Sequence, residues 1–224
     1  WIGVIDKIAR ADVFVLLDNV QFNRAAYQHR TLYSALGEPK LLTLPVKKAG
    51  FLETGLQIPD VELADLRAPA KHFETLRGRY RKTPGWMAWE ARLREILTSG
   101  SSRLMDYAVP TLNMTLEALG IGTRIVLASE LDCFGTKADL VINLVKAAGG
   151  DVYLSGTGAQ DYQSPEQFAA AGIKLIYQNL KHPHWRQSHG SDFQPGCFAL
   201  EWAIEEAAAE AAFGQYWKDS AGHA

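Results

Sequence analysis

The most constraining feature of this sequence is an alternation of strand-like and helix-like segments over residues 124–177. Segments with helical spacing separate three apolar runs that are typical of buried strands, at 124–128, 152–154 and 173–177. Strands joined by helices at this spacing pair in parallel through right-handed crossovers. The sequence therefore predicts an α/β fold with a mostly parallel sheet and flanking helices.

Between residues 63 and 119 the pattern of apolar residues changes from strand-like to helix-like. Proline, glycine and serine residues there separate three consecutive segments of helical spacing, at 66–82, 86–98 and 102–119. A helix is expected near the start of the chain, and two strand candidates follow it, at 13–17 and 41–46. We therefore predict a single α/β domain over residues 1–224, with a helical insertion at about 63–119.

The composition excludes several classes of protein. The chain has 224 residues, 25 acidic and 23 basic, and a net charge of −2, whereas a dedicated nucleic-acid binder normally has a strongly basic face. No apolar run approaches the roughly 20 residues needed to span a bilayer. Two cysteines suit neither a disulfide framework nor a structural zinc site, and they are typical of a reducing compartment. We therefore predict a cytoplasmic protein that binds no nucleic acid, spans no membrane and holds no metal.

The two cysteines, Cys133 and Cys197, leave a second question open. Either one can serve as a nucleophile beside a histidine that lies close in space, and either one can be a buried structural residue. The sequence does not decide between the two roles, nor does it indicate the oligomeric state.

In an open parallel sheet, ligands bind at the carboxyl ends of the strands, and four polar segments of this sequence occupy such positions. The first begins at Asp18, which closes the strand candidate at 13–17. Asp18 is a candidate for orienting a ligand hydroxyl or amine, and an ordinary capped loop is the alternative. The loop after it supplies five candidate binding residues: Gln21, Asn23, Arg24, His29 and Arg30.

Two further segments have features of anion sites. Gly156, Gly158 and Tyr162 follow the strand candidate at 152–154, and glycines there allow backbone N–H groups to approach an anion closely. The spacing is not the dinucleotide fingerprint, so a plain turn is equally compatible with it. Lys137 stands at the start of a helix, where its ammonium group can meet a ligand phosphate.

The remaining segment, residues 182–187, contains two histidines on either side of a proline. In an extended stretch, side chains at i and i+2 point to the same side. The segment lacks a local third metal ligand, which favours general-base work over zinc binding. We therefore predict His182, His184 and Asp18 as catalytic residues, and solvated histidines are the alternative. The same segment supplies two candidate binding residues, Trp185 and Gln187.

Two charged stretches are expected to be structural. The basic residues around Tyr80 spread over more than one face of a helix, which is typical of a solvated surface; they are Lys71, Arg77, Arg79, Arg81 and Lys82. The alanine-rich stretch 203–212 is a good helix former that needs no function; the acidic residues on it and beside it are Glu201, Glu205, Glu206 and Glu210.

The motifs together resemble the WbqC-like protein family. The resemblance covers nearly the whole chain and rests on five segments in order, at 11–22, 27–30, 42–46, 153–156 and 182–187. Members usually begin with a Gln-Pro-x-Tyr-x-Pro-Trp segment, so the resemblance implies that a first strand precedes Trp1. Two departures stand out. His29 replaces an asparagine of the family pattern, and the stretch 195–201 lacks the family's serine and ends on Glu201 in place of an aspartate.

The resemblance implies a role in the biosynthesis of bacterial surface polysaccharide such as O-antigen. The expected reaction transfers an acyl or aminoacyl group to an amino sugar, with a nucleotide-sugar and an acyl donor as small-molecule substrates. In that mechanism His182 or His184 deprotonates the acceptor amine. The other expected roles are orienting the sugar, by Asp18 and Gln21, and holding phosphate or carboxylate charge, by Arg30 and Lys137. The resemblance implies no particular cofactor.

Two other functions stay open at this point. The helix at 3–10 and the strand after it resemble the opening of nucleotidyltransferase-like α/β domains, in which a nucleotide sits on the helix N-terminus. A non-catalytic carbohydrate-binding module is the third possibility, with exposed aromatics near Trp185, Trp86 and Trp89. The last two stand at core spacing on a helix, which disfavours the binding module.

Overall fold

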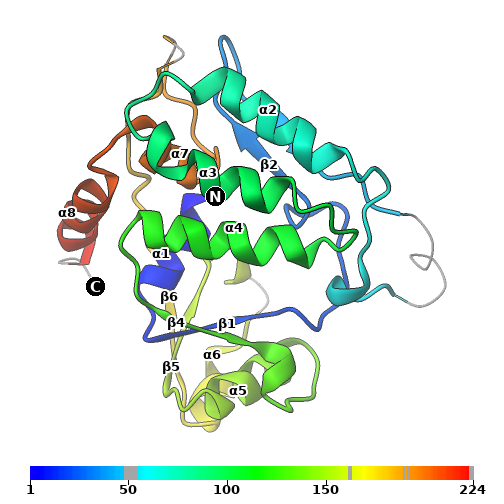
Figure 1. Cartoon of the computed structure of the whole chain (residues 1–224). Coiled ribbons are helices and arrows are strands. Elements are labelled where there is room, and N and C mark those ends of the chain that lie inside the picture. Colours follow the sequence, from blue (N-terminus) through cyan, green and yellow to red (C-terminus); the bar gives the residue numbers. More distant parts are fainter. Residues whose placement is uncertain (48–54, 161–162, 189, 191, 222–224) are drawn as a thin grey trace. The chain divides into compact units, whose positions relative to one another are not determined.

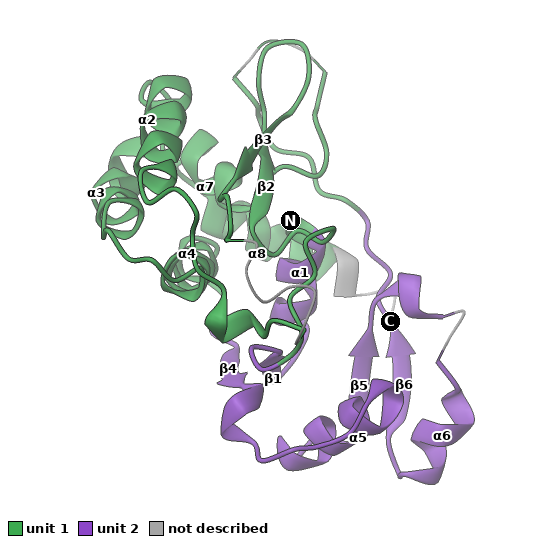
Figure 2. Cartoon of the chain, turned by 90° about the vertical axis from the view of Figure 1, so that its right-hand side faces the viewer, with its two compact units in different colours: residues 1–2, 20–121, 182–224 green, residues 3–19, 122–181 purple. Residues whose placement is uncertain are grey.

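A computed structural model covers the chain and describes residues 1–47, 55–160, 163–188, 190 and 192–221. It divides into two compact units (Figure 2). Unit 1 comprises residues 1–2, 20–121 and 182–224, and unit 2 comprises residues 3–19 and 122–181. The three helices expected between residues 63 and 119 belong to unit 1. Whether the two units fold together as a single domain stays a prediction.

Unit 2 is built from parallel strand pairs and helices (Figure 1). Strand β1 (Val13–Leu16) pairs in parallel with β4 (Arg124–Leu127), and β5 (Val152–Ser155) pairs in parallel with β6 (Lys174–Tyr177). The helices are α1 (Ile2–Ala9, whose first residue belongs to unit 1), α5 (Lys137–Ala147) and α6 (Pro165–Ala170), with short 3-10 helices η2 (Ala128–Glu130) and η3 (Thr157–Ala159). The predicted α/β fold, with parallel strands and flanking helices, is confirmed.

The β5–β6 pair of unit 2 has a core of its own. Ile142 of α5, Phe168 of α6 and Ile173 form a buried apolar cluster, and the ring of Tyr153 stacks on Phe168 at 5.5 Å between ring centroids. Parallel register places the carboxyl ends of β5 and β6 side by side, with Ser155 opposite Tyr177. The sequence pattern that predicts these elements is local, and the structure follows it closely.

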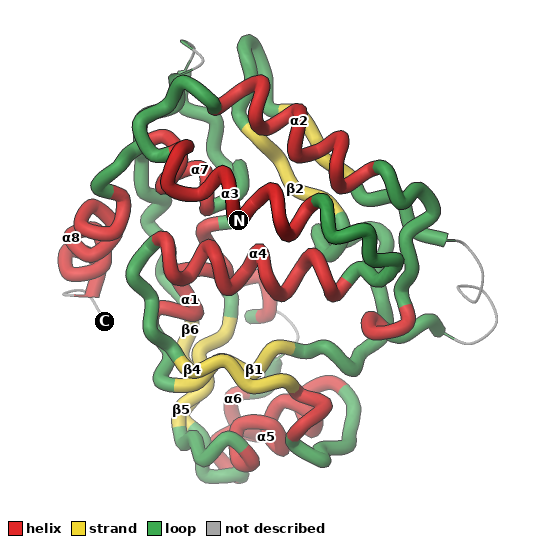
Figure 3. The backbone as a smooth tube through the Cα atoms, viewed as in Figure 1, coloured by secondary structure: helices red, strands yellow, loops and turns green. Residues whose placement is uncertain are grey.

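Unit 1 contains the three predicted helices, α2 (Ala68–Tyr80), α3 (Trp86–Leu97) and α4 (Met105–Ala118). They pack against one another in chain order, and the short helix α7 (Leu200–Glu205) packs against α3 and α4 (Figure 3). Phe73, Trp86, Met114 and Ile204 are almost completely buried among them. Trp86 therefore has the core position that its helical spacing predicts.

Gly85 lets α3 begin directly against α7. A Cβ atom at Gly85 would lie 1.8 Å from the carbonyl oxygen of Ala203, which is far inside van der Waals contact. The Gly85 N–H donates a hydrogen bond to the carbonyl oxygen of Ile204 at 3.0 Å. The close approach requires a residue without a side chain at this position.

An antiparallel hairpin completes the strands of unit 1. It pairs β2 (Arg30–Tyr33) with β3 (Lys40–Thr43), and the backbone N–H of Phe198 donates to the carbonyl oxygen of Leu32 at 2.9 Å. The strand expected at 41–46 is present but ends at Thr43, before Pro45, which has no N–H to donate. Strand β2 has no counterpart among the predicted strands, because residues 30–33 carry neither an apolar run nor an alternating pattern.

The C-terminal helical stretch differs from its prediction. Residues 203–212 do not form one continuous helix, because α7 ends at Glu205 and α8 (Ala209–Ala221) begins after a break. Helix α7 is buried along its whole length, and Glu201 and Glu205 on it are only 0% and 1% exposed. The remaining short element is the 3-10 helix η1 (Ile58–Asp60). In the described part of the chain, no helix combines the length and apolar character that a membrane crossing requires.

Candidate functional site

The candidate site of unit 1 is a group of rings that we name the His182 cluster: His182, His184, Trp185 and Phe193. The His182 ring stacks on Trp185 at 5.8 Å between centroids, and the His184 ring stacks on Phe193 at 4.3 Å. The two imidazole centroids lie 6.5 Å apart with an interplanar angle of 82°. The structure therefore brings together the two histidines that the sequence singles out.

The surroundings of His182 fix which of its nitrogens carries a proton. Nδ1 lies 2.7 Å from the carbonyl oxygen of Pro183, and because a carbonyl oxygen only accepts, Nδ1 is the donor. Nε2 is buried and has no hydrogen-bond partner among the residues that the structure describes. A neutral His182 therefore presents an unused lone pair at Nε2, which is the requirement for a general base.

A buried carboxylate, Glu201 at the start of α7, holds the cluster in place. Its Oε1 accepts hydrogen bonds from the Ser34 N–H at 3.1 Å and from the Tyr80 hydroxyl. Its Oε2 accepts from Trp185 Nε1 at 3.2 Å and from Gln187 Nε2 at 2.8 Å. Trp185 Nε1 is therefore bonded to Glu201, and Gln187 Nε2 is shared between Glu201 and the carbonyl oxygen of Gln194, while the binding roles of the two residues stay predictions.

A second buried carboxylate, Glu205, lies one turn further along α7. Its Oε1 accepts from Arg79 Nη2 at 3.1 Å and from both the N–H and the hydroxyl of Ser188 at 3.0 Å. The Arg79 side chain is only 15% exposed, and its Nε donates to the carbonyl oxygen of Ser34 at 2.9 Å. The expectation of a solvated basic face is therefore wrong for Arg79, because its guanidinium is bonded to Glu205, Ser34 and Ser188.

Cys197 is enclosed by the same network. It is fully buried, and burial together with the negative charge of Glu201 raises the pKa of its thiol to about 12. A thiol with that pKa is protonated at neutral pH, which favours the buried structural role for Cys197. Cys133 lies in unit 2 and is half-buried.

The loop before β2 carries the other predicted binding residues of unit 1. Asn23 Oδ1 accepts from the N–H of Ala25 at 2.9 Å, and the Asn23 N–H donates to Gln28 Oε1 at 2.7 Å. These bonds shape the turn, as the capped-loop alternative expects. Gln21 is exposed and forms an isolated antiparallel bridge with Gln57.

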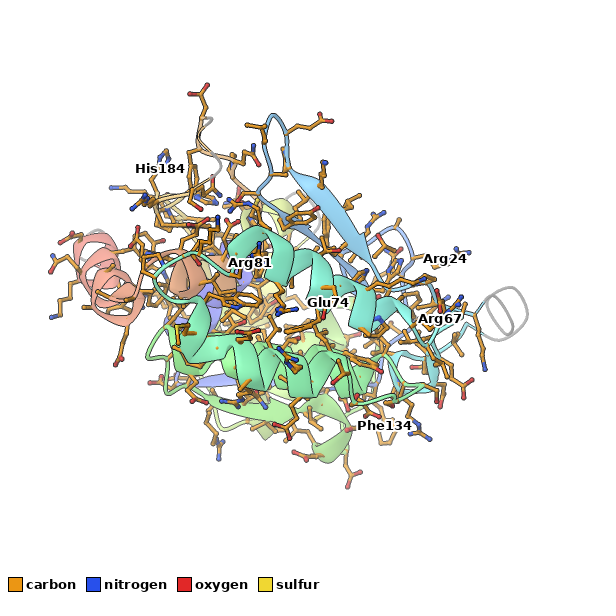
Figure 4. All side chains as sticks on the ribbon, turned by 45° about the horizontal axis from the view of Figure 1, so that its top comes forward. Arg24, Arg67, Glu74, Arg81, Phe134 and His184 are labelled. Carbon is orange, nitrogen blue, oxygen red and sulfur yellow. The ribbon has the colours of Figure 1, made fainter. Side chains whose placement is uncertain are left out.

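The loop and the His182 cluster lie toward opposite ends of α2. Figure 4 shows Arg24 toward the end of α2 marked by Arg67, and His184 toward the end marked by Arg81. Arg24 is exposed, while His29 and Arg30 are half-buried. The structure therefore does not bring Arg24 to the predicted base, although both belong to unit 1.

Asp18, the third predicted catalytic residue, is buried in unit 2. Its Oδ1 accepts from the N–H of Ser129 at 2.9 Å, and its Oδ2 accepts from the Ser129 hydroxyl at 2.6 Å. Both carboxylate oxygens thus tie the end of β1 to the residues that follow β4. This bonding is the structural alternative foreseen for Asp18, and its catalytic role stays a prediction.

The other predicted residues of unit 2 lie on two separate turns. Gly156 follows β5 and is half-buried, with Lys7 Nζ 3.8 Å from the position where a Cβ would stand, and burial lowers the pKa of Lys7. Gly158 is exposed in η3. Lys137 is exposed at the start of α5 with a positive φ of 53°. Tyr162 lies outside the described residues.

Among the residues that are described, no three His, Cys, Asp or Glu side chains converge as metal ligands.

Several residues of this network are absent from the predicted site, above all Glu201, Arg79 and Phe193. For Glu201 the sequence does contain a signal, because the family-like stretch 195–201 ends on an acidic residue at that position. For Arg79 and Phe193 no motif marks the position, and only their contacts with α7 and with residues 182–188 identify them.

Comparison with known proteins places this arrangement in a family. The chain is 25% identical over 207 residues to a protein of Mycobacterium tuberculosis (strain ATCC 25618 / H37Rv) named "Uncharacterized protein Rv1507c", covering 90% of this chain and 87% of that protein. No solved structure is a significant match. The sequence model of the WbqC-like protein family matches residues 1–205 of the chain. The chain therefore belongs to the WbqC-like protein family.

Proposed function

We propose that this protein is a biosynthetic transferase that uses His182 as a general base to transfer an acyl or aminoacyl group to the amine of a sugar precursor. The observation that carries the proposal is the state of His182. Its Nδ1 proton is held by the Pro183 carbonyl oxygen, and its buried Nε2 has no partner among the described residues. We place the reaction in the cytoplasm, in keeping with the cysteine usage of the chain.

The chemistry requires a base because an amine attacks only in its neutral form. With an acyl thioester as donor, the sugar nitrogen forms a bond to the acyl carbonyl carbon, and the carbon–sulfur bond breaks with its electron pair on sulfur. His182 Nε2 takes the proton that the nitrogen loses and delivers it to the leaving thiolate. Histidine suits both steps, because its ordinary pKa of about 6.5 lies near neutrality.

The neighbours of His182 support this role. Trp185 stacks on one face of the imidazole, and Glu201 fixes the Trp185 ring through its Nε1. The base is thus held in one orientation before substrate binds, which lowers the entropic cost of reaching the reactive geometry. His184 is exposed beside it and supplies an aromatic surface for the acceptor.

Replacing the base tests the proposal. His182→Gln should lower turnover by about 10²- to 10⁴-fold, the usual contribution of a general base. His184→Gln is the matched control, because it changes an exposed imidazole of the same cluster, and we expect its turnover to fall by less than about tenfold. Thiol release from a panel of acyl thioesters, with uridine-diphosphate amino sugars as acceptors, measures turnover. Circular dichroism verifies that both variants are folded.

Two results would contradict the proposal. Unchanged turnover in His182→Gln removes His182 from the mechanism, whatever the result for His184→Gln. Thermal stabilisation by ATP or CTP, with none by acyl thioesters or nucleotide-sugars, favours a nucleotidyltransferase-like enzyme instead.

A further inference from the structure

A second set of polar side chains in unit 1 lies in the loop at 21–30, where the family resemblance leads us to expect that Arg30 holds phosphate or carboxylate charge. His29 Nδ1 and Arg30 Nε are both buried, and neither has a hydrogen-bond partner among the described residues. A buried polar atom without a partner destabilises the folded chain, and more so when the group is charged. Two such nitrogens on adjacent residues therefore indicate a partner that the described part of the chain does not supply.

Among the described residues, the charges that act on His29 are positive. Burial lowers the pKa of His29, and the positive charges of Arg30 and Arg24 lower it further. Within the described residues, no carboxylate forms an ion pair with Arg30. A group that brings negative charge to this loop would relieve the repulsion and supply the missing acceptor.

The two residues are held in place by the loop itself. The Arg30 guanidinium lies 5.2 Å from the centroid of the Tyr27 ring, and its Nη2 donates to the carbonyl oxygen of Ala25. The His29 ring packs edge-on against Phe22 at 5.4 Å between centroids. The donor atoms are thus already ordered, so a ligand does not bear the cost of ordering them.

We propose that His29 Nδ1 and Arg30 Nε bind an anionic oxygen group of a small molecule, either a phosphate or a carboxylate. Arginine matches both groups, because its planar N–H donors pair with anionic oxygens through charge-assisted hydrogen bonds. The site is distinct from the His182 cluster, since Arg24 and His184 lie toward opposite ends of α2 (Figure 4).

Nuclear magnetic resonance of the histidine rings in the full chain tests this site without any assay of turnover. We expect inorganic phosphate or acetate, titrated in parallel, to shift the His29 ring signals saturably and to raise the His29 pKa toward its ordinary value. The anion with the lower Kd identifies the ligand group as phosphate or carboxylate. Because the free chain is observed, the outcome is independent of any role of His182.

Three variants make the test specific. Arg30→Gln removes the charge and the Nε donor, and we expect it to weaken anion binding by about 10- to 100-fold. His29→Phe removes the nitrogen but keeps a ring against Phe22, so the variant is expected to fold. Its anion binding, measured by calorimetry, should be weakened to a similar extent. Arg92→Gln is the control, because Arg92 is a partly exposed arginine of α3 paired with Glu117, and it should leave the Kd unchanged. No saturable shift at His29 with either anion, or an unchanged Kd in Arg30→Gln, would overturn the proposal.

Discussion

At the residue scale, Glu201 illustrates what makes a carboxylate compatible with a protein interior. A charged group without partners is too costly to bury, but four donors surround this one, from Ser34, Tyr80, Trp185 and Gln187. Burial raises the pKa of the Tyr80 hydroxyl, and the negative charge of Glu201 raises it further. Tyr80 therefore stays protonated and remains a donor to Glu201.

The substitution Glu201→Gln tests this account. An amide places an N–H group where one carboxylate oxygen accepted from two donors. Those two hydrogen bonds are lost, and the two donors are left buried without an acceptor. We expect the free energy of unfolding to fall by about 2–4 kcal/mol, measured by urea denaturation. Glu95→Gln is the matched control on the exposed face of α3 and should change it by less than about 0.5 kcal/mol. A fall in Glu201→Gln no larger than in the control contradicts the role assigned to this carboxylate.

At the element scale, the packing of α3 against α7 depends on one missing side chain. The carbonyl oxygen of Ala203 occupies the space that a Cβ on Gly85 would need, and the Gly85 N–H is bonded to Ile204. Both contacts involve backbone, which cannot rotate away as a side chain can. The start of α3 and the end of α7 are therefore coupled through this glycine.

A pair of glycine substitutions separates this effect from helix propensity. Gly85→Ala should destabilise the protein by about 1–3 kcal/mol or more, because backbone must shift to admit the methyl group. Gly78→Ala lies inside α2, where nothing stands within 4 Å of the added Cβ, and it should stabilise by about 0.5–1 kcal/mol. Thermal unfolding of both variants gives the comparison. Equal unfolding midpoints for the two variants would show that the close contact at Gly85 does not affect the stability of the protein.

At the scale of the whole molecule, the chain forms two compact units that are both discontinuous in sequence. All 6 tryptophans of the sequence fall in the residue ranges of unit 1. Unit 2 has its own apolar cluster, centred on Phe168. Tryptophan fluorescence therefore reports on unit 1, while circular dichroism reports on the helices of both units.

This distribution of tryptophans allows the units to be followed separately. Phe168→Ala leaves a cavity in the core of unit 2 and should cost about 3–5 kcal/mol. We expect the circular dichroism midpoint in urea to fall while the fluorescence midpoint stays in place. Phe73→Ala is the counterpart in unit 1, beside Trp86, and should lower the fluorescence midpoint. If Phe168→Ala lowers both midpoints equally, the chain unfolds as the single domain that its sequence predicts.

Most of the elements were predictable because their signals are local. Helices α2, α3 and α4 follow from apolar spacing over their own residues, and the cap of α6 follows from Ser164-Pro165, where Ser164 accepts from the N–H of Gln167 at 3.4 Å. The proximity of His182 and His184 also follows from their own spacing in an extended segment. Each of these features depends on neighbours within a few residues of the same segment.

The sequence by itself determined the α/β class, the positions of most helices and strands, and the family, because periodicity, capping and motif order are written along the chain. Only the tertiary structure decided that Glu201 and Arg79 are buried, that residues 30–33 form a strand, and that Arg24 lies away from His184. The reason is distance along the chain. Ser34 and Glu201 are 167 residues apart, so neither carries a local sign of the hydrogen bond that joins them.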